Sequence, residues 1–253
     1  MATLNRDGVN IYYEVHGSGP ALILTHGFSA TSQMWTGQID EIAKDHTFIT
    51  WDMRGHGQSD YPEDPAAYNE ELTIQDMTAI LDAVGVEKAI IGGLSLGGYM
   101  SLGFNYLHPE RVNALMIIDS GPGYKSDYGR NAWNANCEET AKSFETEGLA
   151  RLASKSPEMA SSNHRSADGL IKAARGMMAQ KDDHVILSLP YVEVPTIVLV
   201  GADDEAFIAP ADYMAGKIPG AKKVVIPRAG HASNIDQPED FNAAVRTFLD
   251  SLS

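Results

Sequence analysis

The 253-residue chain has few of the residues on which several protein classes depend. It holds a single cysteine, Cys137, so an intrachain disulfide is impossible and a disulfide-stabilised scaffold is excluded. Lysine and arginine number 19 against 34 aspartates and glutamates, which gives a formal net charge of −15. No run of basic residues offers a local patch for a polyanion, so we expect no nucleic-acid partner.

Long apolar stretches are also missing. No stretch reaches the roughly 18 uncharged apolar residues that cross a bilayer, and the N-terminal sequence MATLNRDG lacks the apolar segment of a signal peptide. We therefore expect a cytoplasmic protein with no membrane partner. The acidic composition itself predicts a well-solvated surface rather than a function.

Short apolar runs alternate with helical patterns over most of the chain. Such alternation predicts an α/β fold with a mostly parallel central sheet and helices on both faces. The Asp7-Gly8 pair before residues 9–15 is a hairpin signal and predicts a short antiparallel start. Further strands are expected at 21–26, 47–52, 89–93, 112–119, 196–201 and 222–227.

Helical patterns fill the intervals between these runs. The expected helices cover 33–44, 74–84, 97–107, 211–217 and a last segment that starts at Pro238. Thr73 is expected to cap the second of these, because Asp76 three residues later resembles a capping box. Gly85 fits the C-terminal stop of the same helix.

The alternation stops between residues 121 and 194. Helical patterns near 132–152 and 168–180 follow one another there with no strand between them. We interpret 121–194 as a helical cap insertion over the carboxyl edge of the sheet, which leaves 1–120 and 195–253 as the core. The alternative is a pair of ordinary crossover helices with long loops.

The strongest chemical signal is Gly93-Leu94-Ser95-Leu96-Gly97, which matches G-x-S-x-G. The motif lies between a predicted strand and a predicted helix, the context in which a tight turn projects a nucleophilic hydroxyl. The glycines remove side chains that would clash in that turn, and the helix N-terminus presents free N–H groups to a developing negative charge. Ser95 is therefore predicted to be a nucleophile.

A serine hydroxyl becomes a good nucleophile only when a base takes its proton. His231 follows the last predicted strand and precedes the last helix, so it is expected at the same sheet edge as Ser95. Two other downstream histidines, His164 and His184, lie in the insertion and are expected to face solvent. We predict that His231 is the base.

The base needs a carboxylate that fixes its tautomer and stabilises its cation. Asp203 and Asp204 follow the predicted strand 196–201, again at the carboxyl edge of the sheet. We favour Asp204, with Asp203 as the alternative acid. Asp119, at the end of the strand before the insertion, is a third candidate.

An oxyanion hole needs two donors directed at one point. The backbone N–H of Leu96 is expected to supply the first and that of Phe28, in the loop after 21–26, the second. A plain loop is the alternative interpretation of this His26-Gly27-Phe28 segment.

Aromatic and methionine side chains of the insertion are candidates for an apolar acyl pocket. We predict substrate contacts for Trp133, Met177 and Tyr124, and the same group includes Phe144, Met178 and Tyr128. Packing onto the sheet domain is the alternative role. The chain has no H-E-x-x-H motif, cysteine pair or phosphate-binding G-x-x-x-x-G-K-[ST] loop, so we expect neither a metal nor a cofactor.

These residues, in this order and on these elements, resemble the α/β-hydrolase superfamily over nearly the whole chain. The likeness extends to the segment 52–59, which fits the family's D-x-R-G-x-G-x-S pattern and implies a structural loop. Family members commonly place the acid three residues after the glycine that ends its strand, which implies Asp204. The proline that often follows is shifted here to Pro210, which leaves Asp203 open.

The resemblance also implies the chemistry. Ser95 stands where dehalogenases and epoxide hydrolases of this fold carry aspartate, and Leu94 stands where carbon–carbon bond hydrolases usually carry asparagine. The likeness implies a serine hydrolase, similar to esterases and enol-lactonases, that cleaves a small carboxylic ester or lactone through an acyl-enzyme on Ser95. Alternatives are a carbon–carbon bond hydrolase, a perhydrolase and a non-catalytic small-molecule binding protein with a retained triad. The sequence leaves the oligomeric state open.

Overall fold

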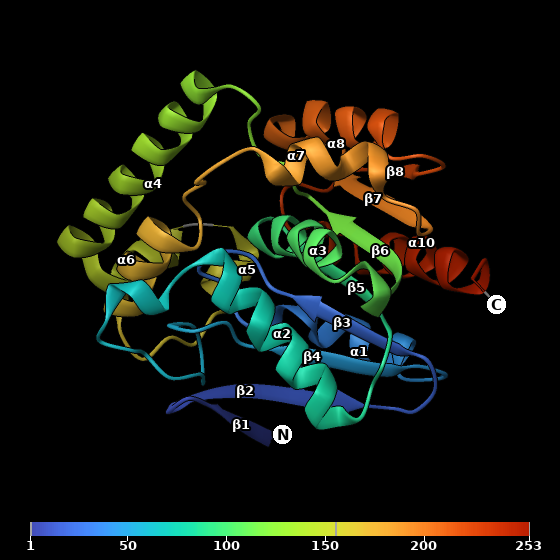
Figure 1. Ribbon diagram of the computed structural model, residues 1–253, viewed down its shortest axis with the longest axis horizontal. Helices are drawn as coiled ribbons and strands as arrows, with labels where there is room; N and C mark the ends of the chain where they lie inside the picture. Colours follow the sequence, from blue (N-terminus) through green and yellow to red (C-terminus); the bar gives the residue numbers. More distant parts are fainter. Residues whose placement is uncertain (1, 155, 253) are drawn as a thin grey trace.

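The computed structural model describes residues 2–154 and 156–252. Within these residues eight strands form one sheet in the order β1-β2-β4-β3-β5-β6-β7-β8 (Figure 1). The strands are β1 (Ala2–Arg6), β2 (Val9–His16), β3 (Ala21–Thr25), β4 (Thr47–Trp51), β5 (Ala89–Leu94), β6 (Val112–Ile118), β7 (Thr196–Gly201) and β8 (Lys222–Ile226). From β4 to β8 all neighbouring strands are parallel, so the predicted sheet is confirmed.

The sheet starts with an antiparallel hairpin, as predicted. Asp7 and Gly8 connect β1 to β2 with φ angles of 50° and 89°. Positive φ at both central residues gives a turn whose twist matches that of the strands it joins. β2 also pairs antiparallel with β4, which attaches the hairpin to the parallel part of the sheet.

Helices cover both faces of the sheet (Figure 1). They are α1 (Thr36–Ile42), α2 (Glu70–Val84), α3 (Leu96–Leu107), α4 (Asp127–Glu147), α5 (Pro157–Ala160), α6 (Ala167–Gly176), α7 (His184–Ser188), α8 (Glu205–Lys217), α9 (Ser233–Asp236) and α10 (Pro238–Asp250). α2, α3 and α8 pack on one face, and α1 and α10 pack on the other. Along β3, for example, Ile23 faces the first group while Leu22 and Leu24 face the second. This double burial explains why the inner strands β3, β5, β6 and β7 are apolar at almost every position.

The start of α2 differs from the prediction. Asn69 caps this helix, and its side chain accepts a hydrogen bond from the Leu72 N–H. Thr73 therefore lies inside the helix, where its hydroxyl donates to the Asn69 carbonyl. Asp76 does not close a capping box: it is buried and accepts two hydrogen bonds from Arg54, at 2.6 and 2.8 Å. Asparagine caps a helix at least as well as threonine, and it moves the start one turn earlier.

Two other helices have shifted starts. The expected helix 33–44 is a 3-10 turn at Ser32–Trp35 followed by α1, which ends at Ile42. α8 starts at Glu205 rather than residue 211, and Pro210 lies inside it. Pro210 is the sixth residue of α8, so it removes one N–H from the i to i−4 hydrogen bonds of the helix. Pro238 does occupy the first turn of α10 as predicted.

Between β6 and β7 the described residues form α4 to α7 and contain no strand. α4 packs along α6, and both lie beyond the edge of the sheet where β5 runs into α3 (Figure 1). The limits of a separate cap, at 120/121 and 194/195, remain a prediction. Among the described helices none is long and apolar enough to span a bilayer.

Candidate active site

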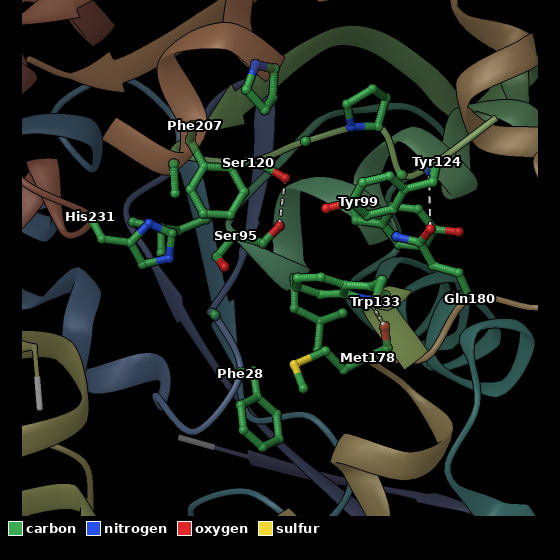
Figure 2. A pocket seen from close by; sticks show the side chains of 18 of the residues that line it. Phe28, Ser95, Tyr99, Ser120, Tyr124, Trp133, Met178, Gln180, Phe207 and His231 are labelled. Atoms are coloured by element: carbon green, nitrogen blue, oxygen red, sulfur yellow. Dashed lines mark hydrogen bonds between the residues drawn. The ribbon is translucent and has the colours of Figure 1, made fainter. Parts of the chain in front are cut away.

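The turn between β5 and α3 holds Ser95 in a strained conformation. Its φ is 55° and its ψ is −115°, a combination that non-glycine residues rarely adopt. The Ser95 N–H donates to the Ile118 carbonyl at 2.9 Å, and its own carbonyl accepts from the Ser120 hydroxyl at 2.6 Å. Neighbouring β6 thus fixes the turn, and the serine side chain points into a cavity (Figure 2).

The glycines of the turn are required by close backbone contacts. A β-carbon on Gly97 would lie 2.1 Å from the Thr25 carbonyl oxygen, and one on Gly93 would lie 2.6 Å from the same oxygen. Both distances are far below van der Waals contact. The glycine spacing therefore allows β3, β5 and α3 to meet closely at the serine.

His231 and Asp204 form a hydrogen-bonded pair at the carboxyl edge of the sheet. The His231 Nδ1 lies 2.8 Å from Asp204 Oδ2, and this carboxylate is buried. Asp203, next to it, is exposed, and its N–H donates to the Ala229 carbonyl. Of the two adjacent carboxylates predicted as the acid, the structure brings Asp204 to the histidine. The Phe207 ring stacks on the His231 imidazole, with the ring centres 4.8 Å apart.

Asp119 connects the structural elements next to the His231–Asp204 pair. Its buried carboxylate accepts hydrogen bonds from the Gly201 N–H at 2.7 Å and from the N–H and hydroxyl of Ser233. It therefore joins the ends of β6 and β7 to α9 rather than bonding to His231. Burial raises the pKa of Asp119 to about 7.

The electrostatic surroundings favour protonation of His231. Burial is the largest single influence on its pKa and acts to lower it. The hydrogen bond to Asp204 and the charge of that carboxylate act in the opposite direction, and the pKa is raised overall. The charges of Asp119 and Glu158 add to this increase. A histidine in such surroundings accepts a proton readily, as a general base must.

Phe28 and Leu96, the residues expected to supply the oxyanion-hole N–H groups, both line the same cavity. In the described part of the chain neither N–H donates to a protein acceptor. Leu96 is the first residue of α3, so its N–H also lies at the positive end of the helix dipole. The two N–H groups expected for an oxyanion hole thus have no protein acceptor among the described residues, and both residues line the cavity that Ser95 borders.

Neutral histidines fix the loop that carries Phe28. His26 accepts a hydrogen bond from the Met53 N–H at 3.0 Å, and burial lowers the pKa of His26 to about 4. His164 donates to the Ser29 carbonyl at 2.9 Å and accepts from the Gly57 N–H at 3.1 Å. The expectation that His164 faces solvent was wrong, because the insertion folds back over this loop. His184, the other histidine expected to face solvent, places its Nε2 2.8 Å from Glu70 Oε1.

The cavity beside Ser95 has a volume of about 370 Å³. In Figure 2 His231 lies on one side of Ser95 and Trp133 on the other. Most of the cavity lining is apolar. The main apolar side chains are Phe28, Tyr99, Trp133, Met159, Met178 and Phe207. A cavity of this size and character fits a small, largely apolar molecule.

The structure corrects one of the predicted pocket residues. Trp133 and Tyr124 line the cavity, but Met177 does not. Its side chain is 1% exposed and packs in the core next to α6, whereas the following residue, Met178, faces the cavity. Consecutive residues at a helix end point in different directions, and α6 ends one residue before Met177.

Three other residues of the insertion lie away from the cavity. Phe144 is buried and packs edge-on against the Phe28 ring, with the ring centres 6.0 Å apart. Tyr128 is 87% exposed. Cys137 is buried, and this burial raises the pKa of its thiol to about 12. Among the described residues no group of three potential metal ligands comes together.

Sequence reasoning missed several lining residues. Glu158 of α5, Gln180 after α6 and Phe207 of α8 all border the cavity. Phe207 lies three residues after Asp204, on the first turn of a helix whose start was placed too late. Glu158 and Gln180 lie in polar stretches of the insertion that carry no motif.

Comparison with known proteins adds four findings. A family model described as the alpha/beta hydrolase fold matches residues 20–238. A putative 2-succinyl-6-hydroxy-2,4-cyclohexadiene-1-carboxylate synthase from Bacillus subtilis is 28% identical over 100% of this chain and 100% of its own. A 3-oxoadipate enol-lactonase from Acinetobacter baylyi is 29% identical over 98% of this chain and 96% of its own. The crystal structure of a thermophilic esterase from Thermogutta terrifontis, with malate bound, superposes with a TM-score of 0.81 and 28% identity, covering 99% of this chain and 97% of that one.

Proposed function

This chain belongs to the alpha/beta hydrolase family, and on that basis we propose that it is a serine hydrolase that cleaves a small carboxylic ester or lactone through an acyl-enzyme on Ser95. One observation carries the proposal. A strained serine, a histidine paired to a buried aspartate and two free N–H donors border a single apolar cavity. The similarity to an enol-lactonase and an esterase supports the ester or lactone class.

The proposed reaction has two halves. In the first, Ser95 Oγ attacks the acyl carbon while His231 Nε2 takes the hydroxyl proton, and Asp204 holds the Nδ1–H of the imidazolium. The N–H groups of Phe28 and Leu96 stabilise the oxyanion. The C–O bond to the leaving alcohol then breaks, and His231 gives the alcohol its proton. In the second half, His231 takes a proton from water, the hydroxide attacks the acyl carbon, and the acid leaves as the proton returns to Ser95.

We place the substrate between the sheet domain and the insertion, which acts as the cap. Trp133 and Met178 from the insertion face Phe28 and Phe207 of the core across the cavity (Figure 2). These side chains exclude water from the acyl group. The name of the Bacillus subtilis relative refers to a carboxylate, but no lysine or arginine is among the described lining residues, so this cavity offers no cationic side chain to bind such a group.

The pH dependence follows from the environment of His231. Only the neutral imidazole can take the serine proton, and the surrounding carboxylates raise its pKa. We expect kcat/KM to increase with pH along a limb whose midpoint lies above the ordinary histidine value of about 6.5. Steady-state rates between about pH 5 and 9 measure this midpoint, and near-UV circular dichroism checks that the fold is constant. A midpoint below the ordinary value would contradict the proposed surroundings of the base.

A substrate panel tests the reaction class. We expect measurable turnover of p-nitrophenyl esters of short acids and of γ-butyrolactone, because the cavity accepts a small acyl group. Ring-fission products with a carbon–carbon bond to cleave are expected to react slowly or not at all. Faster cleavage of those products than of every ester and lactone would instead assign the protein to carbon–carbon bond hydrolysis.

A further inference from the structure

Among the described residues that line the proposed substrate cavity, one carries a buried carboxylate. Glu158, on the short helix α5, is 2% exposed and lines the same cavity as Ser95 and His231. Its Oε1 accepts a hydrogen bond from the Ser156 hydroxyl, whereas its buried Oε2 has no partner among the described residues. A buried carboxylate oxygen without a hydrogen bond is costly, so its presence in a cavity indicates that a ligand completes it.

The other polar side chains of the cavity are largely occupied by protein partners. The Tyr99 hydroxyl donates to Glu70 at 3.3 Å, and the Trp133 indole N–H donates to the Met178 carbonyl at 2.8 Å. In the proposed reaction Ser95 acts as the nucleophile and His231 as the base. Among the described residues that line the cavity, Glu158 is the one with a fully buried side-chain oxygen that has no hydrogen-bond partner.

The charge of the cavity also favours a positively charged ligand. No lysine or arginine is among its described lining residues, so Glu158 carries the only full charge there apart from a protonated His231. The Glu158 carboxylate also contributes to the raised pKa of His231, which places it within electrostatic range of the reacting atoms. In a cavity shielded from water, such a charge attracts a cation and repels a second carboxylate strongly.

We propose that Glu158 is a specificity-determining residue whose free Oε2 binds a hydrogen-bond-donating, positively charged substituent of the substrate. This inference rests on the proposed ester or lactone hydrolysis and narrows its substrate class. The enzyme selects esters or lactones that carry an ammonium group over neutral ones of the same shape. It discriminates most strongly against those that carry a carboxylate.

The test compares p-nitrophenyl esters that differ only at the end of the acyl chain. The ammonium esters are 3-aminopropanoate and 6-aminohexanoate, the neutral isosteres are butanoate and heptanoate, and the anionic ester is adipate. For at least one chain length we expect kcat/KM of the ammonium ester to exceed that of its isostere about tenfold or more, with adipate the poorest substrate. Glu158→Gln keeps the size of the side chain and should lower the ammonium-to-neutral ratio about 10- to 100-fold.

Glu139→Gln is the matched control. Glu139 is an exposed residue of α4 outside the cavity, and its replacement removes the same charge from the insertion. We expect this variant to keep the wild-type ratio. Thermal unfolding of both variants separates loss of selectivity from loss of fold. Ratios near one in the wild type at both chain lengths, or equal ratios in wild type and Glu158→Gln, would overturn the assignment.

A binding measurement separates this inference from the proposed reaction. On Ser95→Ala, calorimetry is expected to show tighter binding of hexylammonium than of hexanoate, and the added substitution Glu158→Gln should remove the difference. If the ammonium preference appears in binding while no ester is hydrolysed by the wild type, the proposed reaction fails and the role of Glu158 stands. If esters are hydrolysed and hexylammonium has no advantage, the role of Glu158 fails alone.

Discussion

Ser95→Ala is expected to lower kcat for ester hydrolysis by about four to six orders of magnitude. Alanine lacks the hydroxyl that would form the acyl-enzyme, and neither His231 nor the free N–H groups can replace it. The fold should persist, because alanine keeps the β-carbon that the turn at φ 55° already accommodates. Turnover of a p-nitrophenyl ester by protein of verified circular dichroism measures the loss.

Ser101→Ala provides the control for this loss. Ser101 lies on α3, one and a half turns beyond the site, and its buried hydroxyl donates to the Gly97 carbonyl at 2.7 Å. We expect the variant to keep turnover within a few-fold of the wild type. Full activity of Ser95→Ala would show that another group is the nucleophile, and the hydroxyl of Ser120, which also borders the cavity, would be the first to examine.

Asp204→Asn is expected to lower kcat by about three to four orders of magnitude with little change in KM. The asparagine amide can donate to His231 Nδ1, which places the remaining ring proton on Nε2. That nitrogen then cannot accept the Ser95 proton, and the imidazolium loses the charge that stabilises it. The steady-state constants kcat and KM measured on one ester separate this effect from weaker substrate binding.

The neighbouring residue, Asp203, provides the control for Asp204→Asn. Asp203→Asn removes the same charge one residue away, from an exposed side chain. We expect a change of a few-fold at most. Loss of turnover in Asp203→Asn with retention in Asp204→Asn would reverse the assignment, and equal small losses in both would leave Asp119 as the acid to test.

The sheet and the core of the site could be predicted because their signals are local. Strands buried on both faces are apolar at almost every position. The G-x-S-x-G motif between a strand and a helix has a steric explanation, which the close contacts at Gly93 and Gly97 show. Parallel strands end at one edge, so residues that follow β5, β7 and β8 had to lie near one another. The choice between Asp203 and Asp204 needed the structure, because side-chain direction at a turn decides it.

Side-chain positions in the insertion were hard to predict, because they too depend on side-chain direction. Its side chains are fixed by contacts with distant loops rather than by a repeating pattern. His164 reaches the loop of Phe28, and Glu158 turns into the cavity, yet both lie in short polar segments that are typical of solvent-exposed turns. Met177 and Met178 are equivalent in sequence, and only the end of α6 determines which one faces the substrate.

The central claim is that His231 and Asp204 activate Ser95 as a nucleophile. Reaction with a fluorophosphonate at neutral pH, followed by intact mass and peptide mapping, tests it most directly, because the probe forms a stable adduct only with an activated serine. We predict one adduct per chain, located on Ser95, absent in Ser95→Ala and formed far more slowly in Asp204→Asn. An unlabelled protein, or an adduct on any other residue, would contradict the account.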